Sequence, residues 1–149
     1  MSTTEPALFT FVKLTVADID AATAFFESGF GLTHADTVDT PTFREHVMTG
    51  PKGAMTIVLF HWKDGRAIDT GNGYGPVGMV SRDLDADLAR ALAAGAKQKG
   101  ETVQFGPARI AFVRAPEGHE IEIMQMGAAA PQAEEKRGVR GPRSPIARP

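Results

Sequence analysis

The chain contains one sequence pattern twice, at an offset of 83 − 18 = 65 residues. The first copy reads TVADIDAATAFFESGFGL around Asp18, and the second reads MVSRDLDADLARALAAGA around Asp83. Each copy passes from a short apolar segment through Asp-Ile/Leu-Asp-Ala into a stretch of helical periodicity that ends near glycine. A repeat of this length exceeds the unit of a solenoid. The pattern therefore predicts two similar modules that enclose a shared cavity, where we expect a ligand.

Composition limits the class of protein. With 149 residues, 42% of them apolar and 23% charged, the chain is typical of one globular domain, which we place at residues 7–126. The absence of cysteine excludes disulfides and thiolate chemistry. A net charge of −2 gives no general attraction to nucleic acid or to an anionic membrane. The sequence shows neither a long apolar run nor a signal-peptide pattern, so we expect a cytoplasmic protein.

The first module, about residues 7–62, has the pattern of a strand, a helix and three further strands. Residues 9–16 alternate like a half-buried strand, and Asp18 is a good N-cap for the helix that follows. Residues 33–38, 42–48 and 55–62 are the next strand candidates. Turn signals at Thr40-Pro41 and at residues 50–53 separate them.

The second module, about residues 74–126, repeats this order. A strand at 76–81 leads to Asp83 as N-cap, and strands follow at 97–105, 109–114 and 120–126, the first of them interrupted by Gly100. The fold class is therefore α+β, with two βαβββ modules. Residues 127–149 are rich in proline, glycine and charge, which predicts a flexible tail.

Two stretches resemble the vicinal oxygen chelate superfamily, which includes glyoxalase I, extradiol dioxygenases, methylmalonyl-CoA epimerase and bleomycin-type resistance proteins. They are VKLTVADIDAATAFFESGFGL and GNGYGPVGMVSRDLDADLARALAAGA with the later RIAFVRAPEGHEIEIMQ. The aspartate at each helix start, the Phe25-Phe26 pair and the PEG-x-x-IEI ending carry the likeness, and GNGYG is most like glyoxalase I. The resemblance implies two modules that form one cavity.

The resemblance also implies a metal site, which this sequence does not reproduce. In the family each half contributes two ligands to a divalent ion that stabilises an oxyanion intermediate. Carried over by position, the ligands fall on Phe11, Ile57, Pro76 and Glu122, of which only Glu122 can bind a metal. We therefore expect no standard metal site and no cofactor. A relocated site formed by His46, His61 and Glu122 is the alternative.

Strand alternation suggests which side chains line the cavity. The predicted lining is apolar at its centre with polar groups around it, and this mixture suits an amphiphilic organic ligand. The predicted ligand-binding residues are Phe11, Arg44, Met48, Ile57, Leu59, His61, Arg109 and Met124.

Glu122 is the candidate general base, with His46 and Lys13 as further catalytic candidates. In the alternative interpretation Glu122 is paired with Lys13 or Arg109 and has no chemistry, and His46 is a hydrogen-bonded strand histidine.

Three functions are compatible with these features. The first is an isomerase, epimerase or lyase that moves a proton on a carbonyl compound without the standard metal. The second is a binding protein similar to the bleomycin-type resistance proteins, which sequesters a small molecule without catalysis. The third is a metal-dependent enzyme similar to lactoylglutathione lyase. In each case the partner is a small molecule, and a homodimer is expected because relatives often dimerise.

Overall fold

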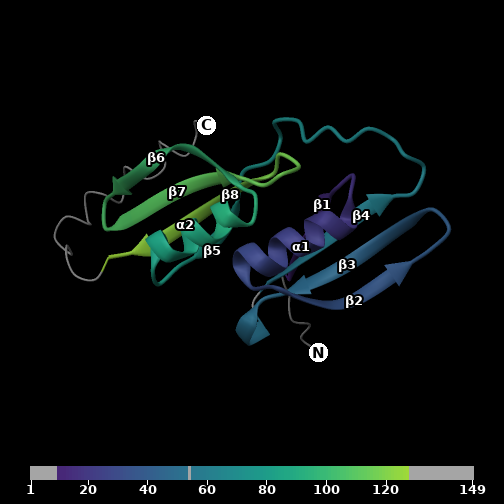
Figure 1. Cartoon of the computed structure of the whole chain (residues 1–149), viewed down its shortest axis with the longest axis horizontal. Helices are drawn as coiled ribbons and strands as arrows, with labels where there is room; N and C mark the ends of the chain where they lie inside the picture. Colours follow the sequence, from purple (N-terminus) through teal and green to yellow (C-terminus); the bar gives the residue numbers. More distant parts are fainter. Residues whose placement is uncertain (1–9, 54, 128–149) are drawn as a thin grey trace, which may run out of the picture. The chain divides into compact units, whose positions relative to one another are not determined.

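The computed structural model describes residues 10–53 and 55–127, so the expected tail lies, apart from Gly127, outside the described residues. The chain separates into two compact units, Met1–Asp69 and Thr70–Pro149. Each unit consists of one four-stranded sheet with one helix lying across it (Figure 1). Among the described residues, none of the helices is both long enough and apolar enough to cross a membrane.

The first unit contains sheet A, in the strand order β1-β4-β3-β2. Strands β1 and β4 are parallel, whereas β2, β3 and β4 pair antiparallel. The elements are β1 (Phe11–Thr15), α1 (Ile19–Phe30), β2 (Thr33–Asp39), β3 (Phe43–Thr49), a 3₁₀ turn η1 (Pro51–Gly53) and β4 (Thr56–Trp62). The predicted α+β fold and strand-helix-strand order are confirmed.

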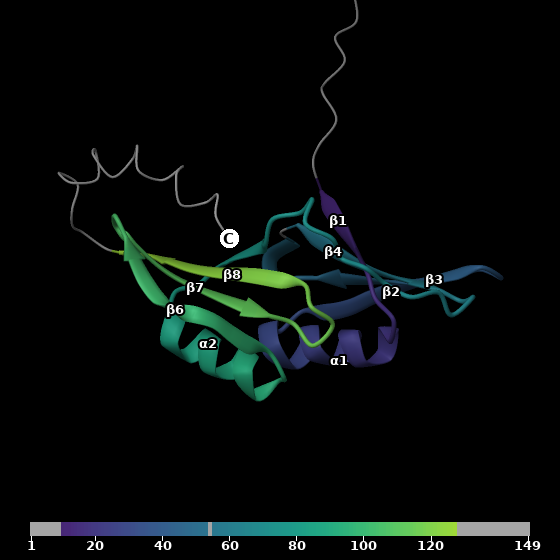
Figure 2. The same cartoon turned by 90° about the horizontal axis from the view of Figure 1, so that it is seen from above.

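The second unit repeats this topology in sheet B, in the strand order β5-β8-β7-β6. Strand β5 runs parallel to β8, and the other pairs are antiparallel. The elements are β5 (Val77–Val80), α2 (Leu84–Ala93), β6 (Lys97–Phe105), β7 (Ala108–Arg114) and β8 (Glu120–Met126). Figure 2 shows each helix beneath one side of its own sheet.

Both helices begin at the predicted aspartates. The carboxylate of Asp18 accepts a hydrogen bond of 3.0 Å from the N–H of Ala21, and that of Asp83 accepts one of 3.1 Å from Ala86. These bonds satisfy backbone donors that have no partner inside the helix. Helix α1 ends at Gly31, whose φ of 68° lies in the left-handed region that glycine adopts without strain.

Each unit buries its own apolar core between helix and sheet. In the first unit, Phe25 and Phe26 are buried and meet edge to face, with ring centroids 5.0 Å apart. In the second, Leu84 of α2 and Ile121 and Ile123 of β8 are fully buried. We call the side of each sheet that faces its helix the helix side, and the opposite one the far side.

Candidate functional site

The strand register shows which residues share each side of sheet A. Leu14 lies opposite Leu59, and Leu59 lies opposite His46, so their side chains point the same way. His46 contacts Thr23 of α1, which identifies this as the helix side. Phe11 and Lys13 alternate with Val12 and Leu14 along β1, and therefore lie on the far side.

This register corrects the predicted cavity lining. The predictions grouped the following residues with Phe11 and Lys13, but the structure places them on the helix side: Arg44, His46, Met48, Ile57, Leu59 and His61. Met48 and Leu59 have no exposed surface, as expected for core residues. The prediction was wrong because β4 reads TIVLFHW, where apolar residues occupy both sides and alternation does not distinguish them.

His46 is held in the core by hydrogen bonding and stacking. Its Nδ1 lies 2.7 Å from the Thr23 hydroxyl, which itself donates to the carbonyl of Ile19. Because that hydroxyl hydrogen is already used, Nδ1–H of His46 is the donor to Thr23. Burial lowers the pKa of His46, and the neighbouring His34 ring, stacked at 4.0 Å, adds to this effect. These contacts match the alternative interpretation of a hydrogen-bonded strand histidine.

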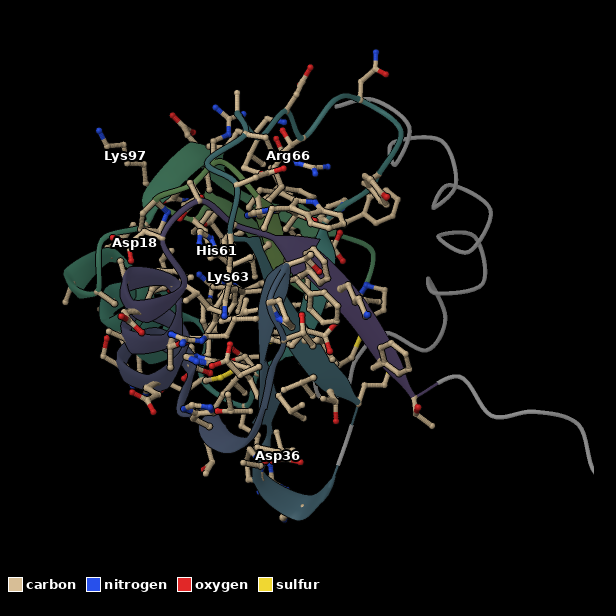
Figure 3. All side chains as sticks on the ribbon, turned by 90° about the vertical axis from the view of Figure 1, so that its right-hand side faces the viewer. Asp18, Asp36, His61, Lys63, Arg66 and Lys97 are labelled. Carbon is tan, nitrogen blue, oxygen red and sulfur yellow. The ribbon has the colours of Figure 1, made fainter. Side chains whose placement is uncertain are left out.

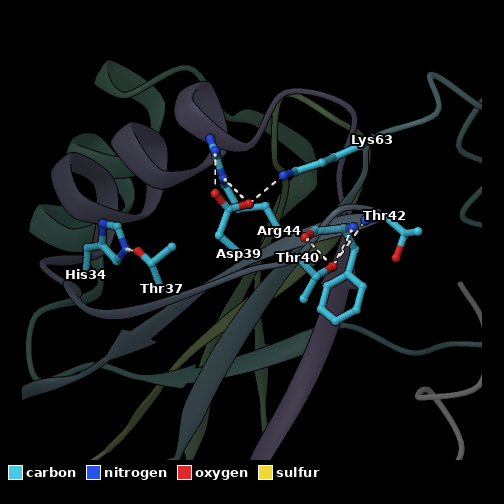
Figure 4. A network of polar contacts seen from close by, with 8 residues as sticks. His34, Thr37, Asp39, Thr40, Thr42, Arg44 and Lys63 are labelled. Carbon is cyan, nitrogen blue, oxygen red and sulfur yellow. Dashed lines mark hydrogen bonds and ion pairs between the residues drawn. The ribbon is translucent and has the colours of Figure 1, made fainter.

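The other two polar residues that were predicted to line the cavity and lie on the helix side, His61 and Arg44, also have hydrogen-bond partners. His61 Nδ1 lies 3.3 Å from the carbonyl oxygen of Val16. Arg44 donates to Asp39 over 3.0 Å, and Lys63 donates to the same carboxylate over 2.6 Å (Figure 4). These two hydrogen bonds lower the pKa of Asp39 to about 2. Arg44 is thus part of an ion network at the edge of its unit.

The far side of sheet A carries an ion pair that sequence reasoning missed. Lys13 Nζ lies 2.5 Å from Glu45 Oε2, and the Glu45 side chain is only 11% exposed. The sequence of β3, FREHVMT, predicts Arg44, His46 and Met48 as the ligand-facing set, which turns Glu45 to the opposite side. A partner 32 residues away on another strand also leaves no local sequence signal. Lys13 remains half exposed, so the pair is open to a ligand from one side.

Aromatic rings lie beside this ion pair on the far side. Phe43 stacks on Phe60 with centroids 5.0 Å apart, and Trp62 meets Phe60 edge to face at 4.8 Å. Lys13 Nζ lies 5.4 Å from the centroid of Phe60, in the range of a cation–π contact. Phe11 is 48% exposed on the same side. This surface suits a ligand with a flat apolar body and a polar group.

The far side of sheet B presents Glu122. Its partners across the strands are Gly78 and Phe112, and Met124 follows on the same side. Among the described residues Glu122 makes no hydrogen bond or ion pair. Within residues 10–53 and 55–127, a Cβ atom built on Gly78 would meet nothing within 4 Å beyond the glycine and its two chain neighbours. The carboxylate therefore lies beside open space on a mainly apolar surface.

Arg109, predicted to line the cavity, lies on the helix side of sheet B. It is opposite Gln125, whose side chain accepts from the N–H of Leu84 at the start of α2. Its guanidinium donates to Asp85 of α2 over 3.1 Å. The prediction that Arg109 lines the cavity is therefore wrong. It rested on one residue near the start of β7, and a single residue does not determine which side of the sheet the strand's alternate residues face.

A second carboxylate of β8 is fully engaged. Glu120 receives hydrogen bonds from Lys99 at 2.6 Å and from Arg114 at 3.0 Å. The Lys99 bond, helped by Arg114, lowers the pKa of Glu120. Lys99 and Arg114 also line a pocket of about 280 Å³ near the β7–β8 turn, together with Lys97 and Pro116. Glu120 thus stays ionised and is held by two cations, whereas Glu122 has no such partner among the described residues.

The residues at the four family ligand positions do not fit a divalent ion. Gly78 lies opposite Glu122, and its counterpart Lys13 (78 − 13 = 65) lies opposite Val58. The position equivalent to Glu122 in the first unit is therefore Val58 rather than Ile57, and neither side chain can bind a metal. Across residues 10–53 and 55–127, no group of three or more His, Asp or Glu side chains could hold a metal ion.

Comparison with known proteins identifies a family. The family model for the Glyoxalase/Bleomycin resistance protein/Dioxygenase superfamily matches residues 8–123. Among curated protein sequences, none matches the chain.

Solved structures of this family have the same fold. A glyoxalase family protein from Bacillus cereus superposes with a TM-score of 0.75 at 22% identity, over 86% of this chain and 99% of that one. Glyoxalase I from Zea mays gives 0.71 at 20% identity, over 80% of this chain and 44% of that one. An antibiotic-binding protein from a Streptomyces species gives 0.65 at 19% identity, over 84% of this chain and 100% of that one.

Proposed function

Because the chain belongs to the Glyoxalase/Bleomycin resistance protein/Dioxygenase superfamily, we propose that it binds a small carbonyl compound and moves a proton on it with Glu122. The reaction would be that of an isomerase, an epimerase or a lyase. The supporting observation is the Glu122 carboxylate, which has no partner among the described residues and lies beside the open space at Gly78. A single carboxylate among apolar side chains is typical of ligand-binding surfaces, where a few polar groups orient the ligand.

The chemistry assigned to Glu122 is that of a general base. Its carboxylate would remove a proton from the carbon next to the carbonyl group and return one to the product. Phe112 and Met124, on the same side of sheet B, would contact the apolar part of the substrate. In the first unit, taken by itself, Lys13 and Phe11 are proposed as contacts for a ligand, since the Lys13 ammonium group can donate to a ligand oxygen.

Proton transfer can be tested without knowing the natural substrate. We would incubate the protein in D₂O with a panel of small keto and hydroxy-keto compounds and follow deuterium uptake beside the carbonyl by NMR. Glu122→Gln should slow the exchange by about 10²-fold or more, because the amide cannot accept the proton. Glu101→Gln, an exposed glutamate on β6, is the matched control and should exchange at the wild-type rate.

Binding without catalysis is the second candidate. The stacked Phe43 and Phe60 rings favour it, because an aromatic surface can hold a flat molecule without any reaction. If wild-type protein binds a panel compound but promotes no exchange, and Glu122→Gln leaves its affinity unchanged, proton transfer is excluded and binding remains. The antibiotic-binding Streptomyces neighbour has the same fold.

The proposal also includes the expected homodimer and the expected cytoplasmic location. Family members of this size are expected to pair, and static light scattering of the purified protein would give the mass of the particle in solution. A mass of one chain would remove the homodimer from the proposal.

A further inference from the structure

The first unit contains a small pocket at one end of sheet A. Pro41 and Thr42 of the β2–β3 turn form one wall, while Trp62 and residues 63, 64 and 66 of the loop after β4 form the other. Its volume is about 330 Å³, at the lower end of the roughly 300–1,000 Å³ found for ligand pockets. A molecule of one or two fused rings is the size that such a pocket accommodates.

Trp62 lines this pocket and has two kinds of neighbour. The Phe43 and Phe60 rings meet it edge to face, at centroid distances of 6.5 and 4.8 Å. The guanidinium carbon of Arg66 lies over the Trp62 ring, 4.0 Å from its centroid. A planar cation thus lies against a cluster of three aromatic rings, Phe43, Phe60 and Trp62.

Arg66 is oriented by the carboxylate of Asp64 in the same loop. Asp64 accepts from Arg66 Nε at 3.0 Å and from Nη2 at 2.6 Å, which is the two-point geometry that orients a guanidinium most firmly. The backbone N–H of Arg66 also donates to Asp64 over 3.1 Å. Figure 3 labels Arg66 in the loop that follows β4. The flat face of the guanidinium is therefore available in a preset orientation.

The opposite wall of the pocket is equally well ordered. The Thr40 hydroxyl accepts from the N–H groups of Thr42 and Phe43, at 3.2 and 3.0 Å (Figure 4). The N–H of Lys63 donates to the carbonyl of Thr42 over 2.9 Å, which joins the two walls. A pocket whose walls are already ordered loses little conformational entropy when a ligand binds.

We propose that this pocket binds a planar aromatic ring that carries a carbonyl or carboxylate oxygen. The ring would stack on the exposed face of the Arg66 guanidinium, which lies over the Trp62 ring. The oxygen would accept from N–H groups of Arg66 that Asp64 leaves unused, since an arginine has five such donors. The inference deepens the proposed function and depends on it in one respect, namely that the first unit binds ligand.

The protein contains a single tryptophan, so Trp62 gives one indole N–H signal in a ¹⁵N-resolved NMR spectrum. We would titrate the full-length protein with 2-naphthoate and, separately, with its saturated analogue decahydro-2-naphthoate, which has the same charge and a similar size. The indole signal should shift with 2-naphthoate, whose Kd should be about tenfold lower because only the aromatic ring can stack.

Two matched variants assign the effect to Arg66. Arg66→Lys keeps the charge but loses the flat stacking face, and should weaken 2-naphthoate binding about three- to tenfold while leaving the saturated acid unaffected. Arg82→Lys, the same exchange at an exposed position of the second unit, should change neither affinity.

The inference is overturned if the two acids bind equally well, or if the indole signal stays in place while amide signals of the second unit shift. It is also overturned if Arg66→Lys binds 2-naphthoate with the wild-type Kd. These outcomes are separate from the test of Glu122, because naphthoate preference with no deuterium exchange would exclude proton transfer and leave the aromatic pocket intact. Deuterium exchange without a preference for 2-naphthoate would support proton transfer and exclude the aromatic pocket.

Discussion

His46 shows how its surroundings decide the role of a residue type that often carries chemistry. It lies on the helix side of sheet A, 7% exposed, with Nδ1 bonded to Thr23 and its ring stacked on His34. A histidine held in this way is neutral, because burial disfavours the imidazolium form. Its contribution is therefore to stability, and that contribution depends on pH.

The sign of this pH dependence follows from linkage. The pKa of His46 is lowered from its ordinary 6.5 in the folded protein, so below pH 6.5 the unfolded chain binds more protons than the folded one. The stability due to neutral His46 is complete above pH 6.5 and is lost as pH falls through the folded pKa, with a slope of at most about 1.4 kcal/mol per pH unit. Urea unfolding of wild type and His46→Gln between pH 8 and pH 4 checks this. Parallel stability curves for the two proteins would contradict it.

Single residues were predicted well where a local rule applies. Asp18 and Asp83 were identified as N-caps from the residues that follow them, and both accept the expected backbone bonds. Glu122 lies on the far side of sheet B as expected. Glu45 was missed, because its ion pair with Lys13 joins strands that are distant in the sequence.

At the scale of elements, the duplication gives a matched pair of helices. In each, an aspartate carboxylate accepts from the N–H three residues later, so the two caps can be compared in one protein. Replacing an aspartate cap by alanine typically costs about 1 kcal/mol, whereas asparagine caps nearly as well. We expect Asp18→Ala and Asp83→Ala each to lower the free energy of unfolding by about that amount.

The asparagine variants are the controls for this prediction. Asp18→Asn and Asp83→Asn should retain most of the wild-type stability in the same urea unfolding experiment, because the side-chain oxygen remains. Equal losses for alanine and asparagine would show that charge, through the helix dipole, matters more than the hydrogen bond.

The order and approximate bounds of the strands followed from the sequence, but the sides of several strands did not. Turn residues mark strand ends, and β8 was predicted at its observed bounds. Strand β6 has a register shift between Lys99 and Val103, around Gly100, whose φ is 74°. Gly100 thus correctly indicated an irregularity in this strand. In β4, by contrast, Ile57 and Val58 are equally buried, so apolar character could not separate the two sides.

At the scale of the whole molecule, the two units keep one topology with different far sides. Sheets A and B have equivalent strand orders, and each packs on one helix. The far side of sheet A carries Phe60, Trp62 and the Lys13–Glu45 pair, whereas that of sheet B carries Glu122 and the Glu120 ion network. The family fold thus persists in both halves although their far sides carry different residues.

The central claim is that this chain acts without the family's four-ligand metal site, and metal content tests it most directly. Tag-free protein would be analysed by inductively coupled plasma mass spectrometry, and its Tm measured with EDTA and with added Zn²⁺, Ni²⁺, Fe²⁺ or Mn²⁺. Val58 occupies the position equivalent to Glu122, and the side chains of Val58, Phe11 and Pro76 cannot bind a metal. We therefore predict far less than one ion per chain and no rise in Tm. One tightly bound divalent ion per chain, whose removal lowers Tm and abolishes deuterium exchange or ligand binding, would contradict the account.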